Sequence, residues 1–405
     1  MDNSPPIIRN ILLLYLFRLF QKTIFSLPIQ IIYFAGITQN YAFAMSLYSI
    51  SHLTTVALEL PTGCFSDKFG RKWVCVLGAA GLFLSSLFYA FGNAYFWLVC
   101  GAVLTGANKA LASGNDETLL YETMNQIGRK KDYLEVLSKM TSLGQLGLCI
   151  AAAVGGLVSL ISLHAVMYAT ILPMGLAFFI SLFLVEPEHL EKSDKHALSH
   201  VWDSFKYLIK NKRLAYLTAG EACHNGLSEA AFAFNPIFFK LFVPVWSLGV
   251  FRALGHLCGT LGSYFSYRFC HRFGIQKTFL FGAFSNNIIN IISVLANGLL
   301  SPFIKLGSSF VNSMKDPPTN TLMQNEIPNT KRATVLSISS LLNSLVFACS
   351  TVFVGALADT FSPYWAMLSA YTLALLSNFL FVCSLKFDSA DKVLFKKTAT
   401  KSVSE

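Results

Sequence analysis

Long apolar stretches separated by short polar segments dominate the pattern along this chain. They lie at 11–33, 42–64, 73–91, 95–117, 136–159, 163–185, 213–237, 245–268, 278–297, 299–324, 333–357 and 363–385. Each has roughly the 20 residues that an α-helix needs to cross the hydrocarbon core of a bilayer. We therefore predict an all-α membrane protein with twelve transmembrane helices.

The longest polar interruption, at 186–212, predicts a division of the chain into two six-helix halves. We expect these halves at 1–185 and 213–387, with a cytoplasmic linker between them and a basic cytoplasmic tail at 388–405. Part of the linker has apolar residues at helical spacing, interleaved with lysines: Val201, Trp202, Phe205, Leu208 and Ile209. This spacing indicates an amphipathic helix on the inner leaflet, and a plain linker is the alternative.

The composition supports a membrane location. Of the 405 residues, 54% are hydrophobic and only 13% are charged, whereas a soluble domain carries roughly 25% charged residues. The first apolar stretch is too long for a cleavable signal peptide, so we expect it to be a spanning helix. The nine cysteines are scattered without metal-binding spacing, and we expect buried, inert thiols and neither a metal nor another cofactor.

The basic residues predict the orientation of the chain. Most of the 31 Lys and Arg fall on one side if the N-terminus is cytoplasmic, and only Lys240 falls in a loop on the opposite side. This asymmetry follows the positive-inside rule and predicts that both termini are cytoplasmic. The net charge of +10 is then an orientation signal, and we expect no nucleic-acid partner, since the pattern contains no solvated basic domain.

A charged turn at 63–72, here called the first-loop motif, separates the second and third apolar stretches. Its sequence follows the pattern G-x-x-x-D-x-x-G-R-K. A worn copy of its centre, His271-Arg272-Phe273-Gly274, occupies the corresponding place in the second half. A weaker match between 117–120 and 320–323 has nearly the same offset. The agreement of the two offsets indicates that the halves are related by duplication.

The helix count, the central loop, the repeated halves and the first-loop motif together resemble the major facilitator superfamily of transporters. The resemblance covers nearly the whole chain, and the stretches 58–63, 113–122 and 327–334 look like a bacterial branch of drug and siderophore transporters. It implies a secondary active transporter that works as a monomer in the lipid bilayer of a bacterial inner (plasma) membrane. Such a protein moves a small solute by alternating access, with proton symport or antiport.

The resemblance also implies roles for residues in and near the first-loop motif. The family's equivalent of Asp67 contacts arginine near a helix of the second half, so Asp67 would bridge the halves when the cytoplasmic side is closed. Topology determination is the alternative role of the motif. Gly63 allows close helix approach, Gly70 allows a tight turn, and Arg71 holds the turn at anionic headgroups. We expect Glu59 to belong to the same inner gate.

Charged residues inside the predicted helices are the candidate solute-binding groups, because such charges are costly and are usually functional or paired. Arg18, Gln21 and Lys22 share one face of the first helix with Ser26. The full set of predicted substrate-binding residues is Arg18, Gln21, Lys22, Lys109, Asn225, Arg252 and Asn312. These cations favour an anionic solute, such as a carboxylate siderophore or metabolite. Structural pairing of the cations with Glu221 or Asp116 remains open.

Proton coupling requires a carboxylate or imidazole whose protonation can change, and the seventh helix offers Glu221, His224 and Glu229. The fifth helix contains a terminal glycine pair at 155–156 but lacks the Gly-Pro kink that is frequent in the family's drug antiporters. Multidrug efflux is therefore the alternative function, followed by a non-transporting sensor of the same fold. We expect no enzyme, because nucleotide-loop, H-E-x-x-H and G-x-S-x-G motifs are missing.

Overall fold

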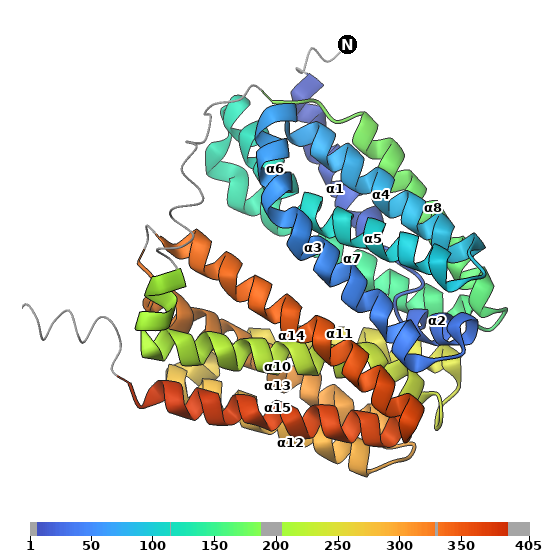
Figure 1. Ribbon diagram of the computed structural model, residues 1–405. Coiled ribbons are helices and arrows are strands. Elements are labelled where there is room, and N and C mark those ends of the chain that lie inside the picture. Colours follow the sequence, from blue (N-terminus) through green and yellow to red (C-terminus); the bar gives the residue numbers. More distant parts are fainter. Residues whose placement is uncertain (1–5, 114, 188–204, 329–330, 388–405) are drawn as a thin grey trace, which may run out of the picture. The chain divides into compact units, whose positions relative to one another are not determined.

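The computed structural model describes residues 6–113, 115–187, 205–328 and 331–387, and these residues form helices without a β-strand (Figure 1). The chain divides into two compact units. The first comprises Met1–Ser193 with Val243–Ala253, and the second comprises Asp194–Phe242 with Leu254–Glu405. The predicted bounds of the halves, the linker and the tail stay predictions.

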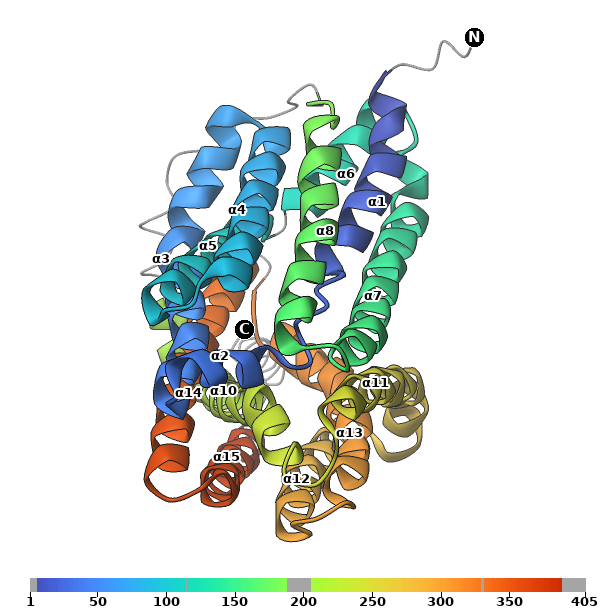
Figure 2. The same cartoon turned by 90° about the vertical axis from the view of Figure 1, so that its right-hand side faces the viewer.

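The first unit has two groups of helices. Its elements are η1 (Pro6–Ile8), α1 (Arg9–Lys22), α2 (Gln30–Thr38), α3 (Tyr41–Phe69), α4 (Arg71–Phe91), α5 (Tyr95–Ala112), α6 (Asn115–Gln126), η2 (Lys130–Asp132), α7 (Tyr133–Val158) and α8 (Leu163–Leu182). Helix α5 packs on α3 and α4, while α1 packs on α7 and α8. Contact between α4 and α8 joins the two groups (Figure 2). Leu14, Phe17 and Leu119 are buried in the core beside α1.

The second unit has the same order of long helices. Its elements are a helical segment at 205–210, α10 (Lys212–Phe239), α11 (Val245–Phe273), α12 (Ile275–Leu295), α13 (Ser301–Asn325), α14 (Arg332–Thr360) and α15 (Pro363–Leu385). The start of α11 belongs to the first unit by its contacts. Helix α10 packs on α14 and α15, and α12 packs on α13 and α15. Leu217, Phe279 and Phe381 are buried where these helices meet.

The two units repeat one local structure where the sequence contains the first-loop motif and its worn copy. Helices α3 and α11 both have 29 residues, and α4 and α12, which follow them, both have 21. The residue between them is Gly70 in the first unit, with φ 96° and ψ 157°, and Gly274 in the second, with φ 86° and ψ 154°. The backbone therefore repeats even where the side chains have diverged.

Seven helical segments in the described part of the chain are long and apolar enough to cross a membrane. They are Arg71–Phe91, Tyr95–Gln126, Lys130–Val158, Leu163–Leu182, Ile275–Leu295, Thr334–Thr360 and Pro363–Leu385. The other predicted spans correspond to α3, α10, α11, α13 and the pair α1–α2, which are helical but fall short of those limits of length, hydropathy or charge. The element order is thus consistent with the twelve predicted passes.

The prediction of one continuous helix at 11–33 is wrong, because the chain leaves the helical conformation between α1 and α2. Pro28 lies in this gap; proline lacks the N–H of a helical bond and disfavours helix in the residue before it. The backbone N–H of Ser26 instead donates to Thr170 Oγ1 of α8 at 3.1 Å. Ser26 therefore does not continue the helical face of Arg18.

Linker residues 188–204, including Val201 and Trp202, lie outside the described part of the chain. Residues 205–210 are helical, as the spacing predicts. Leu208 is buried against Leu214, Ile327 and Val335, whereas Ile209 is 56% exposed. The apolar side of this short segment therefore packs partly on protein, and its position on a leaflet stays a prediction.

Small residues of α7 allow this helix to pack closely against α1 and the residues that follow α1. A Cβ atom on Gly147 would lie 2.6 Å from the carbonyl oxygen of Leu19 in α1. A Cβ atom on Gly155 would collide with the carbonyl oxygen of Phe25, just beyond α1. Helices that approach this closely need small residues at the contact.

Candidate functional site

An ion pair joins the first helix of the first unit to its fourth predicted span. Arg18 Nη1 on α1 donates to Asp116 Oδ2 on α6 at 2.5 Å, and the two side chains are 19% and 4% exposed. This is the pairing with Asp116 that the sequence offered as the alternative to solute binding. Gln21, on the same helix, is buried.

Lys22 is the last residue of α1 and is half-buried. Its methylene groups lie against Gly144 and Gly147 of α7. Within the described residues, its amine has neither a hydrogen bond nor an ion pair; the nearby Asp116 attracts it but is bonded to Arg18. A cation within a membrane helix is thus left without a bonded carboxylate, which is costly in a bilayer.

The other two predicted cationic anchors have different surroundings. Lys109 on α5 is exposed, and its Nζ lies 3.3 Å from Nε2 of His52 on α3. Arg252 lies in the part of α11 that belongs to the first unit, and it is half-buried. Neither of them takes part in the Arg18–Asp116 pair.

Gly70 has a second structural reason to be glycine besides its backbone angle. Glu186, which follows α8, accepts hydrogen bonds from the backbone N–H groups of Arg71 at 2.6 Å and Lys72 at 2.8 Å. These N–H groups form the start of α4, where a negative charge is favourable. A Cβ atom on Gly70 would lie 2.6 Å from Glu186 Cδ. An alanine at this position would therefore displace the capping carboxylate.

The remaining predicted gating residues lie on α3 and α4. Arg71 Nε lies 3.5 Å from Glu122 Oε1 of α6. Gly63 and Asp67 belong to α3, but the Asp67 side chain lies outside the described part of the structure. Glu59 is half-buried on α3. The sequence analysis missed Glu186, since a contact across 115 residues leaves no trace in a local pattern.

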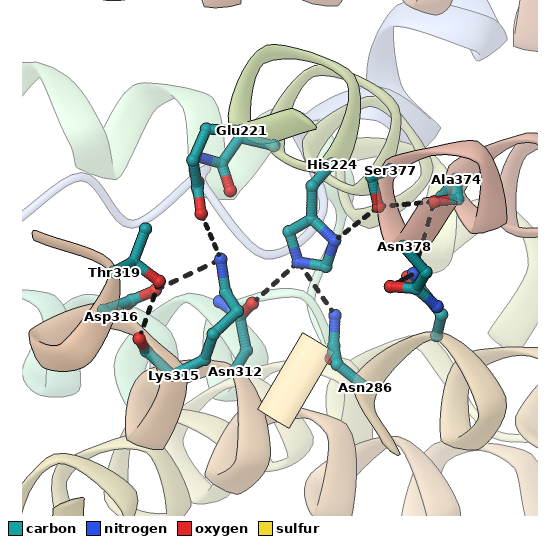
Figure 3. Close-up of polar contacts among 12 residues, drawn as sticks. Glu221, His224, Asn286, Asn312, Lys315, Asp316, Thr319, Ala374, Ser377 and Asn378 are labelled. Atoms are coloured by element: carbon teal, nitrogen blue, oxygen red, sulfur yellow. Dashed lines mark hydrogen bonds and ion pairs between the residues drawn. The ribbon is translucent and has the colours of Figure 1, made fainter. Parts of the chain in front are cut away.

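The second unit contains a more deeply buried ion pair, between α10 and α13 (Figure 3). Lys315 Nζ lies 2.9 Å from Glu221 Oε1, and the side chains are 0% and 10% exposed. Asn225 Nδ2 donates to the other carboxylate oxygen of Glu221 at 2.8 Å. Lys315 Nζ also lies 3.9 Å from Oδ1 of Asp316, whose side chain is 53% exposed.

His224 is fully buried among neutral polar groups beside this pair (Figure 3). Its Nε2 lies 3.2 Å from Asn312 Oδ1 and 3.3 Å from Asn286 Nδ2. Its Nδ1 lies 3.4 Å from Ser377 Oγ. The structure thus brings together four residues that the sequence proposed for substrate or proton binding in two adjacent clusters: Glu221 with Asn225, and His224 with Asn312. Glu229 is exposed.

The polar contacts continue from His224 through the interior of the second unit. Asn290 Nδ2 donates to Asn286 Oδ1 at 3.5 Å. Lys305 Nζ donates to Asn290 Oδ1 at 2.5 Å and to the hydroxyl of Tyr371 at 2.8 Å. That hydroxyl donates to Asn235 Oδ1 at 3.3 Å. These bonds join α10, α12, α13 and α15 by side chains that satisfy one another, which fixes the register of the helices.

Each unit has an ion pair between its first helix and its fourth predicted span, but the positions of the acid and the cation are exchanged between the units. In the first unit, the cation Arg18 stands on the first helix and the acid Asp116 on the fourth predicted span. In the second unit, the acid Glu221 stands on the first long helix and the cation Lys315 on the fourth.

Repeated helical units with membrane-length apolar helices and interior ion pairs define a multi-pass membrane protein of the transporter class. The model for the Major Facilitator Superfamily matches residues 11–349, and the chain belongs to this superfamily. Its members are transporters and not enzymes, as the sequence predicted.

Relatives in sequence carry names of drug-resistance proteins. The chain is 22% identical over 380 residues to multidrug resistance protein MdtD of Salmonella typhimurium, with 78% of this chain and 79% of the relative covered. For MdtD of Yersinia pseudotuberculosis the identity is 25% over 236 residues, with 57% and 44% covered. The chain thus spans less than half the length of the latter.

Solved structures share the fold at low sequence identity. The nucleoside transporter NupG has a TM-score of 0.75 and 15% identity, with 95% of this chain and 100% of NupG covered. A bacterial homologue of the human lysosomal transporter Spinster has a TM-score of 0.73 and 14% identity, with 95% and 98% covered. These likenesses establish the arrangement of helices, while the solute has to be argued from the residues themselves.

We predict that Asp116→Asn lowers the apparent melting temperature in detergent, because it leaves Arg18 without its acid next to Lys22. Breaking a fully buried pair costs about 3–5 kcal/mol, and the partial exposure of Arg18 reduces this figure. The double variant Arg18→Gln with Asp116→Asn should recover much of the loss. Asp132→Asn, which breaks the exposed pair with Arg129, is the control. Equal melting temperatures for the single and double variants would contradict the pairing.

We also predict that Gly70→Ala destabilises the protein more than Gly274→Ala does. Both glycines have backbone angles that are nearly exclusive to glycine, so alanine costs about 1–3 kcal/mol at either. Only at Gly70 does the new Cβ meet Glu186, since nothing lies within 4 Å of a Cβ on Gly274. Thermal unfolding of the two purified variants measures the difference, and equal shifts would argue against the Glu186 cap.

Proposed function

We propose that this protein is a proton-coupled secondary transporter that moves a small anionic organic solute across a bacterial inner membrane by alternating access. The observation that carries the proposal is the half-buried side chain of Lys22, whose amine forms no hydrogen bond or ion pair within the described residues. An ammonium at the centre of a membrane helix costs on the order of 2.5–3.5 kcal/mol. A carboxylate of the solute supplies the missing charge and removes much of this cost.

The surroundings of Lys22 favour an anion with hydrogen-bonding groups. Arg18 lies one turn earlier on α1 and adds a second positive charge, which Asp116 holds in place. Gln21 lies between them in sequence and contributes an amide. Lys109, Asn225, Arg252 and Asn312 remain the further residues that we propose for solute contact; in the free protein Asn225 is bonded to Glu221 and Asn312 lies beside His224.

We propose that proton coupling resides in the second unit, where Glu221 and His224 lie in the buried polar clusters of α10. The ion pair of Glu221 with Lys315 gives a protonation event a structural consequence, because a change in charge alters what holds α10 to α13. Glu229, exposed on the same helix, is the third proposed residue. The predicted gate at Glu59, Gly63, Asp67, Gly70 and Arg71 completes the alternating-access scheme.

Drug efflux is the second candidate function, and the names of the MdtD relatives support it. This function requires that amphiphilic cations, and not carboxylates, cross the membrane in exchange for protons when a pH gradient is imposed. The cationic surroundings of Lys22 favour the anionic solute over this candidate.

The experiment begins with a thermal-shift screen of the purified protein against a panel of di- and tricarboxylates, carboxylate siderophores and amphiphilic drugs. Binding raises the melting temperature in proportion to the logarithm of ligand concentration over Kd. Radiolabelled hits are then offered to proteoliposomes with an imposed pH gradient, with and without a protonophore. If no carboxylate shows proton-dependent flux, the proposed function is wrong.

For the solute found in this way, we predict that Lys22→Gln raises KM by about 10–100-fold, because a hydrogen bond to a charged group contributes about 1.5–3 kcal/mol. Lys22→Arg should retain more affinity than Lys22→Gln. Lys139→Gln is the matched control, since Lys139 is exposed and bonds to Glu135 one turn away on the surface of α7. Equal KM values for Lys22→Gln and the control would remove Lys22 from the site.

A further inference from the structure

Asp316 is the exposed member of a three-charge cluster that is otherwise buried (Figure 3). The amine of Lys315 lies 2.9 Å from Glu221 and 3.9 Å from Asp316. The lysine side chain is 0% exposed and that of Glu221 is 10% exposed, whereas that of Asp316 is 53% exposed. One buried lysine is thus shared by two acids, and only Asp316 is open to its surroundings.

The side of α13 on which Asp316 lies is polar along much of its length. At helical spacing, and half-buried or exposed, it presents Ser309, Asn312, Ser313, Asp316 and Asn320. The other face is buried and carries Met314, Pro318 and Leu322. A carboxylate on a membrane helix is too costly to face lipid and instead faces water or polar groups. Asp316 is therefore the acid of this cluster that water can reach.

The cluster lacks one positive charge. Its two acids and one lysine sum to a single negative charge when all are ionised. Helix α10 adds His224, and the face of α12 that packs on α13 carries neutral amides, such as Asn286 and Asn290. Helix α11 packs on α13 through Gly259 and Gly262. The charged and imidazole side chains of α11 in this unit are His256, Arg268, His271 and Arg272, and its other titratable groups are Cys258, Tyr264, Tyr267 and Cys270. No other acid of the described residues is recorded in contact with Lys315.

The two acids differ in how firmly their charged form is held. Glu221 receives hydrogen bonds from both Lys315 and Asn225, and donors of this kind favour the ionised carboxylate. Within the described part of the chain, the Asp316 carboxylate has one cationic contact, with Lys315 Nζ, at the longer distance of 3.9 Å. Of the two, Asp316 is the acid that a proton from water neutralises at the lower cost.

We propose that Asp316 is the carboxylate at which the coupling proton binds, with Lys315 as the positioning residue that it shares with Glu221. A proton from the aqueous side bonds to a carboxylate oxygen of Asp316, while Lys315 stays with Glu221 and the cluster becomes neutral. The same proton later leaves to water on the other side, and Lys315 is again shared by two ionised acids. This inference rests on the proton coupling of the proposed function, and it assigns the binding of the proton to Asp316 in place of Glu221, His224 and Glu229, with Glu221 as the acid that shares Lys315.

The test uses the full-length protein in detergent without any solute, and the probe is the proton itself. Proton uptake and release are followed with pH indicator dyes, and the curve of each variant is subtracted from that of the wild type, so that the other titrating groups, including the eight histidines, cancel. We expect Asp316→Asn to bind about one proton fewer than the wild type. Asp316→Glu should restore that proton, and Asp132→Asn, on the exposed surface, should change nothing.

The variant Glu221→Gln tests the sharing of Lys315. With Glu221 neutral, Lys315 serves Asp316 alone and stabilises its charged form, so the midpoint of the same proton event should move to lower pH. Loss of the event in Glu221→Gln, or an unchanged proton count in Asp316→Asn, would overturn the proposal. If Asp316→Asn is not monodisperse, the titration of Glu221→Gln tests the proposal instead. A midpoint that does not shift in Glu221→Gln also overturns the proposal.

Failure of the Asp316 proton site can be distinguished from failure of the proposed carboxylate transport. Proteoliposomes without proton-dependent carboxylate flux, combined with the expected titrations, reject the anionic solute and keep Asp316 as a proton site. Flux that depends on protons, combined with a full proton count in Asp316→Asn, keeps the transporter and rejects Asp316.

Discussion

The need to neutralise charge inside a membrane helix is the constraint on which the rest of this structure depends. Each unit meets it by joining its first long helix to its fourth predicted span with an ion pair. Removing one partner of such a pair strands the other in a medium where solvation is poor. The pairs therefore hold helices that are far apart in the sequence, and they determine which charges remain free to meet a solute or a proton.

The two pairs leave different residues available. In the first unit, Asp116 satisfies Arg18 and leaves the amine of Lys22 without a bonded acid among the described residues. In the second, Lys315 satisfies Glu221 and leaves Asp316 with a weaker share of the same cation. A surplus cation and a surplus acid thus arise from one principle applied with opposite polarity. This division suits a protein in which the main cation for the solute belongs to one half and the acid for the proton to the other.

The sequence predicted the features that depend on local pattern. Membrane-length apolar runs and the positions of Gly70 and Gly274 follow from hydropathy and turn chemistry, and the fold and the repeated backbone agree with them. The break after Lys22 had a local signal in Pro28, which the hydropathy of 11–33 concealed. The residues that pair with these charges could not be predicted from the sequence, because pairs such as Arg18–Asp116 and Glu221–Lys315 join residues 98 and 94 positions apart. The spacing of polar residues along α10 identified Glu221 and His224 as interior groups but not what they contact.

The cap that Glu186 places on α4 gives the first-loop motif a mechanical connection that its copy at Gly274 lacks in the described structure. Glu186 stands where the chain leaves α8, one residue before this described stretch ends at residue 187. The exit of the chain from this unit is therefore anchored to the start of α4. A force on the chain that follows Glu186 would therefore act on the turn at Gly70 through the bonds to Arg71 and Lys72.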